Sequence, residues 1–96
     1  MMVLITYDVD TIHEDGARRL RRVSKACSNY GLRVQNSVFE CVLDESKFVL
    51  LREELSGIID KDKDSVRFYF LGNKWQRRVE QIGHNDSINV ESTLII

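Results

Sequence analysis

The sequence contains no proline, only two cysteines among its 96 residues, and no hydrophobic run of membrane-spanning length. Without proline, and with 43% apolar and 30% charged residues, the composition is that of a globular domain rather than a disordered chain. Cys27 and Cys41 are too few for a disulfide framework and lack the spacing of a metal or redox motif. The apolar run Met1–Ile5 is too short for a signal peptide or a transmembrane helix. We therefore expect a cytoplasmic protein with no membrane contact.

The chain is also short, and 96 residues fit one domain near the lower end of the usual size range. We predict a single domain over residues 1–96. A domain of this size buries only about 60–65% of the surface of its unfolded chain. Because a dimer contact would bury more, a homodimer is the first expectation about assembly.

Charge is divided sharply along the chain, although the net charge of −1 by itself argues for no nucleic-acid partner. Residues 16–39 carry six bases and no acid, whereas residues 40–64 carry eight acids against four bases. Such segregation makes a local basic face on a nearly neutral molecule. A solvated helix face without a partner is the alternative, and the charge pattern alone favours it. The six bases are Arg18, Arg19, Arg21, Arg22, Lys25 and Arg33.

A buried strand and then a helix are predicted at the start of the chain. The segment Met2–Val9 is apolar at almost every position, as expected of a central strand covered on both faces. The helix is predicted to start at Thr11, because Thr11 and Glu14 have the spacing of a capping box, and to stop at Gly31. Arginines lie off its apolar stripe, which consists of Ala17, Leu20, Val23, Cys27 and Tyr30.

A hairpin is predicted next. Only twelve residues separate Gly31 from the next helix start, so two strands in this stretch must be short. A tight turn near Asn36–Ser37 would join a strand over Leu32–Gln35 to one over Val38–Leu43.

A second helix and further strands complete the pattern. Asp44 or Ser46 caps this helix, in which the apolar residues Phe48, Leu51, Leu55 and Ile58 keep helical spacing. The polar stretch Asp60–Asp64 is predicted to be a loop. Apolar and polar residues then alternate over Val66–Phe70, which predicts a strand. A short strand is also predicted at Val79–Ile82, and Ile88–Ile96 alternates weakly.

The order strand, helix, strand, strand, helix, strand is that of a ferredoxin-like α+β fold, here with an extra C-terminal strand. Right-handed crossovers place both helices on one face of a four-stranded antiparallel sheet and leave the other face open. Since the first strand is apolar on both faces, a symmetric partner is expected to cover the open face. The C-terminal segment 83–96 ends in Leu94, Ile95 and Ile96, and is expected to pack on that partner as an added strand.

Two motifs identify a family resemblance. The first strand ends in an aromatic-aspartate pair, Tyr7 and Asp8, and the block Gly31–Glu40 has the pattern Gly-x-Arg-x-Gln-x-Ser-Val-Phe-Glu. An arginine-rich first helix and the later strand Val66–Leu71 follow in matching order and spacing. In these features essentially the whole chain resembles the small CRISPR-associated endonuclease family.

The resemblance implies a ferredoxin-like homodimer that takes part in CRISPR spacer acquisition. It also implies assembly with the spacer integrase, whose two dimers flank this homodimer, and a part in holding the incoming DNA duplex. Several family members are described as metal-dependent endonucleases acting on double-stranded DNA or single-stranded RNA. We favour double-stranded DNA, because a two-fold dimer matches a duplex better than a single strand, while RNA stays open.

Asp8 is the residue expected to carry the chemistry. In a two-fold dimer formed through the open sheet face, the two copies of Asp8 approach the axis and can share one cation. Mg²⁺ suits this site because it accepts few carboxylates, keeps several waters and neutralises the phosphate under attack, with Mn²⁺ as a substitute. From the residues alone, Asp8 more often only ends the strand or pairs with an arginine of the first helix. The family resemblance favours the metal site.

Phosphate contacts are expected from arginine and lysine side chains, since guanidinium groups pair with phosphate in a bidentate manner. Arg33 ranks first because it belongs to the matching motif. His13 and His84 have no ligand-spaced neighbours and are not expected to take a catalytic part. The predicted nucleic-acid contacts are Arg18, Arg19, Arg22, Arg33, Lys74, Arg77 and Arg78.

Three functions therefore compete. The first is a metal-dependent endonuclease in which Asp8 is essential, and the second is a non-catalytic architectural DNA-binding subunit of the integrase complex. The third is a toxin-like RNA-binding or RNase module, but the chain lacks the aromatic pair on a central strand that an RNA-recognition sheet uses for stacking. The sequence does not decide between the first two.

Overall fold

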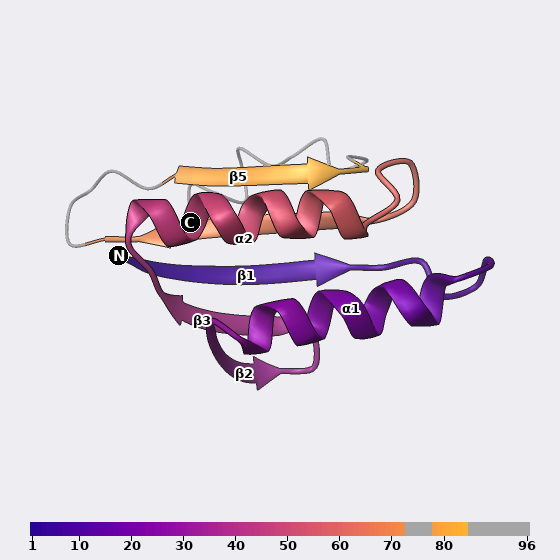
Figure 1. Cartoon of the computed structure of the whole chain (residues 1–96), viewed down its shortest axis with the longest axis horizontal. Helices are drawn as coiled ribbons and strands as arrows, with labels where there is room; N and C mark the ends of the chain where they lie inside the picture. The colour runs from indigo at the N-terminus through magenta and orange to yellow at the C-terminus, as the bar shows by residue number, and fades with distance from the viewer. Residues whose placement is uncertain (73–77, 85–96) are drawn as a thin grey trace.

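The computed structural model describes residues 1–72 and 78–84, whose elements follow the predicted order (Figure 1). Strands β2, β3, β1, β4 and β5 lie in that order in one antiparallel sheet, and Figure 1 shows both helices on the same side of it. The ferredoxin-like α+β prediction is confirmed, but the extra strand β5 pairs with β4 and makes five strands instead of four. The elements are β1 (Met2–Asp8), α1 (Gly16–Ser28), β2 (Gly31–Gln35), β3 (Val38–Val42), α2 (Glu45–Ile58), β4 (Ser65–Leu71) and β5 (Arg78–Gly83).

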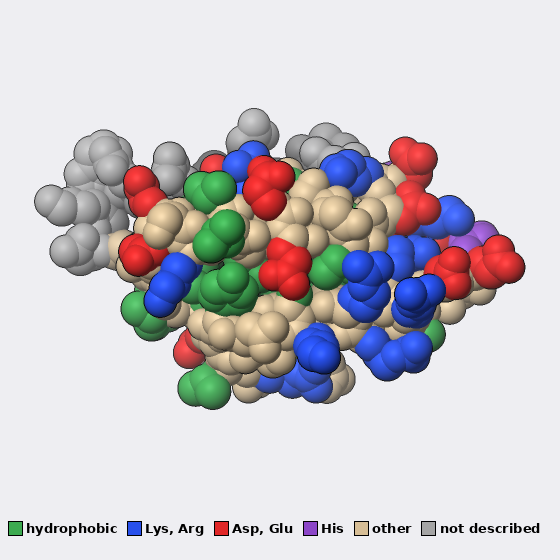
Figure 2. All heavy atoms as spheres, in the orientation of Figure 1, with side chains coloured by type: hydrophobic (Ala, Val, Ile, Leu, Met, Phe, Trp, Pro, Cys, Tyr) green, Lys and Arg blue, Asp and Glu red, His purple; other side chains and the backbone are tan. Residues whose placement is uncertain are grey.

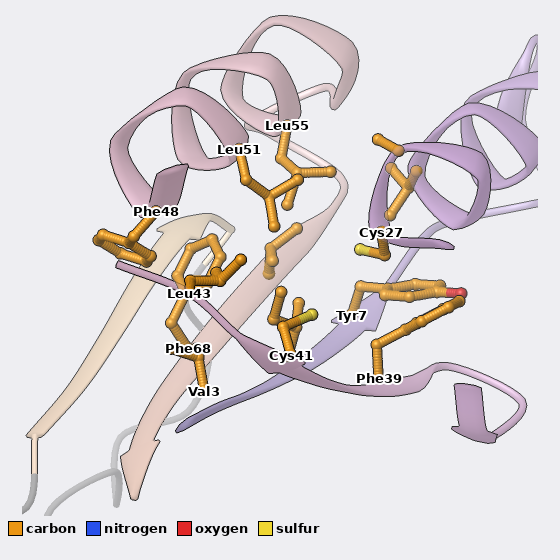
Figure 3. Packing of buried hydrophobic residues seen from close by; sticks show 14 of the residues in the cluster. Val3, Tyr7, Cys27, Phe39, Cys41, Leu43, Phe48, Leu51, Leu55 and Phe68 are labelled. Atoms are coloured by element: carbon orange, nitrogen blue, oxygen red, sulfur yellow. The ribbon is translucent and has the colours of Figure 1, made fainter. Parts of the chain in front are cut away.

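The core lies between the sheet and the two helices. Along β1 the burial alternates, with Val3, Ile5 and Tyr7 buried and the residues between them half-buried. Figure 3 shows the Tyr7 ring beside that of Phe39, and the two ring centroids are 6.2 Å apart. Strand β1 is therefore covered by the helices on one face only, and its other face is open in a single protomer.

The second helix agrees with the sequence prediction. Of the two caps considered, Asp44 is the N-cap, and its carboxylate accepts a hydrogen bond of 2.8 Å from the backbone N–H of Lys47. That hydrogen bond lowers the pKa of Asp44, because it favours the ionised carboxylate. The predicted apolar stripe is buried against the sheet, where Leu51 and Leu55 point inward in Figure 3.

The start of the first helix differs from the prediction. Helix α1 begins at Gly16, after Asp15 in a left-handed conformation with φ 66°, and not at Thr11. The Asp10 carboxylate accepts a hydrogen bond of 2.9 Å from the backbone N–H of Ile12, which folds this stretch into a turn. The capping box predicted at Thr11 is therefore wrong, because a local side-chain contact of Asp10 competes with the helix.

The end of the first helix also differs from the prediction. Helix α1 ends at Ser28. Gly31 is the first residue of β2 and its φ is not positive, so it is not a left-handed helix stop. Any side chain at Gly31 would meet the backbone of Glu40 on β3, which explains the glycine by close packing. The helix is shorter than its apolar pattern predicted, and Ala17 is exposed while Ala26 is buried.

Both cysteines are core residues. Cys27 on α1 and Cys41 on β3 are fully buried free thiols. Burial raises the pKa of Cys27 to about 12 and that of Cys41 to about 11. Both side chains therefore act as small apolar groups in packing.

The helices of the described part, with 13 and 14 residues, lack the length and apolar character of a bilayer span.

Candidate functional site

Asp8 is the last residue of β1, and its exposed side chain lies on the open face of the sheet. Tyr7, the preceding residue, is buried on the opposite face. Across the sheet Asp8 pairs with Ser65 of β4. Among residues 1–72 and 78–84, no side chain donates a hydrogen bond or forms an ion pair with the Asp8 carboxylate, including the arginines of α1.

A hollow of about 250 Å³ opens beside Asp8. Its charged groups are the Asp8 carboxylate and the guanidinium of Arg67, a half-buried residue of β4. The Arg67 Nε donates a hydrogen bond of 2.8 Å to the Oε1 of Gln81 on β5. The lining residues are Thr6, Tyr7, Asp8, Ser65, Arg67 and His84.

The donor set at this hollow suits a cation that keeps its waters. In the described part of the chain, no three Asp, Glu, His or Cys side chains gather closely enough to hold a metal ion. One protomer therefore offers the single carboxylate of Asp8. Mg²⁺ is held in proteins by one or two carboxylates together with several waters, so a second copy of Asp8 would improve the fit.

The basic residues of α1 form a separate surface on the helical side of the molecule. Arg18, Arg21, Arg22 and Lys25 are all exposed. Figure 2 shows Lys and Arg side chains gathered over α1, mainly toward the end where that helix begins. We call Arg18, Arg22 and Lys25 the basic face. These three residues are exposed and lie four and three residues apart along the helix, so they share one face of it.

Arg33 extends the basic face onto β2. Its side chain is exposed, and its guanidinium carbon lies 5.4 Å from the centroid of the Phe39 ring. An Arg33 Nη2 hydrogen also reaches the hydroxyl of Ser24 on α1. Because Phe39 and Ser24 both lie on the helical side of the sheet, Arg33 is on the same layer as the basic face.

Arg19 is held away from the basic face. Its side chain is only 11% exposed, and its Nε donates a 2.7 Å hydrogen bond to the Asp64 carboxylate, which is fully buried. The remaining donors of Arg19 reach the carbonyl oxygens of Glu14 and Asp10 in the loop before α1. These contacts give Arg19 a structural role, while its predicted phosphate contact stays a prediction.

Asp64 is a residue that sequence reasoning missed. Burial raises the pKa of its carboxyl group, but the hydrogen bonds from Arg19 and from the backbone N–H groups of Asp60 and Asp10 outweigh burial and hold the pKa below its ordinary value. The stretch Asp60–Asp64 has the pattern of a solvated loop. Nothing in that pattern separates Asp64 from Asp62, so no local signal could have found it.

The second group of predicted phosphate contacts falls largely outside the described residues. Lys74 and Arg77 lie outside them, as does the segment 85–96 that was predicted to pack on a partner. The backbone of Arg78 begins β5 and pairs with Phe70, but its side chain is not described.

The Asp8 hollow and the basic face occupy one end of the molecule but different layers. Residues 9–15 link the end of β1 to the start of α1, and Figure 1 shows both at the same end of the sheet. A groove of about 380 Å³ on the helical side is lined by Arg18 and Arg22 of the basic face, together with Ile58 and Ile59. A ligand on the basic face therefore approaches from the opposite side to one in the hollow.

The chain is similar to known proteins of one family. The family described as CRISPR associated protein Cas2 matches residues 1–79. The chain is 55% identical over 95 residues to the CRISPR-associated endonuclease Cas2 of Halalkalibacterium halodurans, with 99% of each chain covered. It is 53% identical over 96 residues to the CRISPR-associated endoribonuclease Cas2 of Chlorobaculum tepidum, with 100% of each covered. The crystal structure of Streptococcus pyogenes Cas2 superimposes with a TM-score of 0.71 and 57% identity, over 86% of this chain and 100% of that one.

Proposed function

Because the chain belongs to the Cas2 family of CRISPR-associated proteins, we propose that it is a Mg²⁺-dependent endonuclease of spacer acquisition with Asp8 as its catalytic carboxylate. One observation carries the assignment of Asp8. Nearby carboxylates already have side-chain partners. Asp64 accepts a hydrogen bond from Arg19, and the Oδ2 of Asp10 lies 2.6 Å from the Nδ1 of His13. The Asp8 carboxylate lines an open hollow together with Arg67 and has no such partner among the described residues.

The proposed reaction adds water across a phosphodiester. A new bond forms between phosphorus and the water oxygen, the bond from phosphorus to one sugar oxygen breaks, and that sugar oxygen ends with a proton. When bound, Mg²⁺ would neutralise charge on the phosphate and lower the pKa of water. Asp8 would hold the cation through its carboxylate. Mn²⁺, which also prefers oxygen ligands, is expected to substitute.

Dimer formation through the open sheet face supports this site, because it would bring a second Asp8. At the end of β1 away from Asp8, Met2 lies between Val42 of β3 and Leu71 of β4. These three side chains are 37%, 73% and 45% exposed, respectively. With the half-buried Leu4 beside them, they form an apolar patch that a second copy of the chain would cover.

We predict a dimer at micromolar concentration that Leu4→Glu converts to a monomer, because the variant places a charge in the apolar patch. Sedimentation velocity measures both states. Leu50→Glu on α2, where the side chain is 62% exposed on the helical side, is the matched control and should stay dimeric. A monomeric wild-type chain, or a dimer unaffected by Leu4→Glu, would contradict the open-face interface.

Double-stranded DNA is the proposed substrate, and the spacer integrase is the proposed partner. The basic face supports binding to a nucleic-acid backbone without regard to sequence. RNA stays an alternative substrate, since several relatives are named endoribonucleases. Membership of the Cas2 family disfavours an unrelated toxin-like RNA module.

A second candidate function is a non-catalytic architectural subunit that holds duplex DNA for the integrase. The observation that favours it is the separation of the basic face from Asp8 on two different layers. Binding by the basic face then needs no contribution from the hollow, and both functions can exist in one molecule.

The test of the proposed function is cleavage by Asp8→Asn, which keeps the shape of the side chain and removes its charge. We expect Mg²⁺-dependent cleavage to fall by at least about 100-fold, the order seen when charge stabilisation is removed from an active site. The variant should fold normally because the Asp8 side chain is exposed and has no described partner.

The assay uses one sequence as double-stranded DNA and as single-stranded RNA, each with Mg²⁺ or with EDTA. Asp62→Asn, an exposed carboxylate on the loop before β4, is the matched control and should cleave like the wild type. Equal rates for wild type and Asp8→Asn would remove Asp8 from the mechanism and leave the architectural function.

A further inference from the structure

We propose that Arg67 contacts the phosphate of the nucleic acid that is cleaved at the Asp8 hollow, and so is a second catalytic residue. This inference rests on the proposed nuclease function and adds a substrate-binding group to it. Strand pairing brings Arg67 close to Asp8. Thr6 pairs with Arg67 and Asp8 pairs with Ser65 in the antiparallel register of β1 and β4.

Alternation places the Arg67 side chain on the open face of the sheet. Its neighbours Val66 and Phe68 are fully buried under the helices, so Arg67 lies on the other side, as Asp8 does. Residues two apart on paired strands are diagonal neighbours, within reach of a long side chain. Asp8 and Arg67 are therefore brought to one hollow by two adjacent central strands.

The Arg67 guanidinium is oriented by a neighbouring strand. Its Nε donates a hydrogen bond to the Oε1 of Gln81. The Nε2 of Gln81 in turn donates a 2.8 Å hydrogen bond to the backbone oxygen of His84. In the part of the chain that the structure describes, Arg67 has no ion pair, and its terminal nitrogens have no further hydrogen bond. The side chain is thus oriented at Nε, while no described residue accepts a hydrogen bond from its terminal nitrogens.

The positive charge of Arg67 also favours an anionic ligand. Arg67 is half-buried, and a partly desolvated guanidinium is stabilised by an anion. Asp8 lines the same hollow without bonding to it, so a ligand can meet both groups. A phosphodiester has this chemistry, because its non-bridging oxygens accept from guanidinium nitrogens, and their negative charge grows during attack by water.

The residue comparison uses Arg67→Gln and Arg67→Lys, with Arg52→Gln as the matched control. Arg52 is an arginine of α2 on the helical side, 3.5 Å from Glu80 and away from the hollow. We expect Arg67→Gln to lower kcat on the order of 100-fold, as loss of one transition-state donor does. Arg67→Lys should recover part of that loss, since it keeps the charge without the bidentate geometry. Arg52→Gln should cleave like the wild type.

A binding measurement tests the same contact without catalysis. The probe is the dinucleotide thymidylyl-thymidine, which has a single phosphodiester, titrated in EDTA into the full-length ¹⁵N-labelled chain. We expect amide shifts at Thr6 and Ser65 in the wild type, in Asp8→Asn and in Arg52→Gln. Arg67→Gln should abolish those shifts.

The outcomes separate this inference from the proposed function. If Arg67→Gln leaves both the shifts and kcat unchanged, Arg67 does not contact phosphate. If Arg67→Gln dissociates the dimer in sedimentation while the shifts persist, Arg67 is an interface residue and the inference is overturned. If Asp8→Asn cleaves at the wild-type rate while Arg67→Gln loses the shifts, the proposed catalytic carboxylate fails but the phosphate contact stands.

Discussion

Changing Arg18, Arg22 and Lys25 together to glutamate is expected to weaken binding to duplex DNA on the order of 10³-fold at moderate salt. All three side chains are exposed on α1, and none forms an ion pair among the described residues. The change replaces three attractive charges by three repulsive ones at the surface that phosphate would contact. Because the side chains are exposed, the fold should persist.

Salt dependence gives a second and independent readout of the same variant. Each phosphate contact releases counterions. A plot of the logarithm of affinity against the logarithm of salt concentration therefore has a negative slope of about 0.9 per contact. Losing three contacts should reduce that slope by about three. Affinity measured by fluorescence anisotropy over a series of salt concentrations yields both numbers.

A matched control distinguishes a local binding face from overall charge. Changing the exposed residues Lys47, Lys61 and Lys63 to glutamate makes the same change in net charge outside α1. This control should retain most of the affinity and most of the salt slope. If the two triple variants lose affinity equally, the basic face has no specific role in binding.

Replacing Asp64 by alanine is expected to lower the free energy of unfolding by about 3–5 kcal/mol, the usual cost of removing one partner of a buried ion pair. Asp64 is fully buried and accepts from Arg19 and from two backbone N–H groups, those of Asp10 and Asp60. The variant leaves the guanidinium of Arg19, whose side chain is 11% exposed, and both N–H groups without their carboxylate acceptor.

The change should also disturb the loop that leads from β1 to α1, because Asp64 and Arg19 hold its backbone. Urea denaturation followed by circular dichroism measures the difference. Asp62→Ala, an exposed residue two positions away, should change stability by less than about 0.5 kcal/mol. A loss below about 1 kcal/mol in Asp64→Ala would show that the pair contributes little.

The pKa of Asp64 sets how this stabilisation varies with pH. Its carboxyl group has a folded-state pKa below the ordinary value of 3.8, so the unfolded chain binds more protons in acid. The stabilisation is complete above the unfolded-state pKa and is lost as pH falls through the folded-state pKa. The difference in stability between the wild type and Asp64→Asn should be constant near neutral pH and shrink below about pH 4.

Local patterns account for what the sequence predicted correctly. Successive side chains of a strand point to opposite faces, so Tyr7 and Asp8 lie on opposite sides of β1, and this needs only neighbouring residues. The Asp44 cap and the two-residue turn between β2 and β3 are equally local. The start of α1 was predicted wrongly because the loop before it is held by Asp10 and Arg19, of which Arg19 lies beyond the predicted cap.

The sequence by itself determined the order of the elements, the side of β1 on which Asp8 lies and the family, because each depends on residues close together in the chain. Only the tertiary structure decided that Arg19 pairs with Asp64, 45 residues away, since a desolvated guanidinium needs a carboxylate that folding brings to it. The hollow shared by Asp8 and Arg67 likewise exists because β1 and β4 are neighbours in the sheet. The separation of the basic face from Asp8 has the same origin, because the helices cover one face of the sheet and leave the other open.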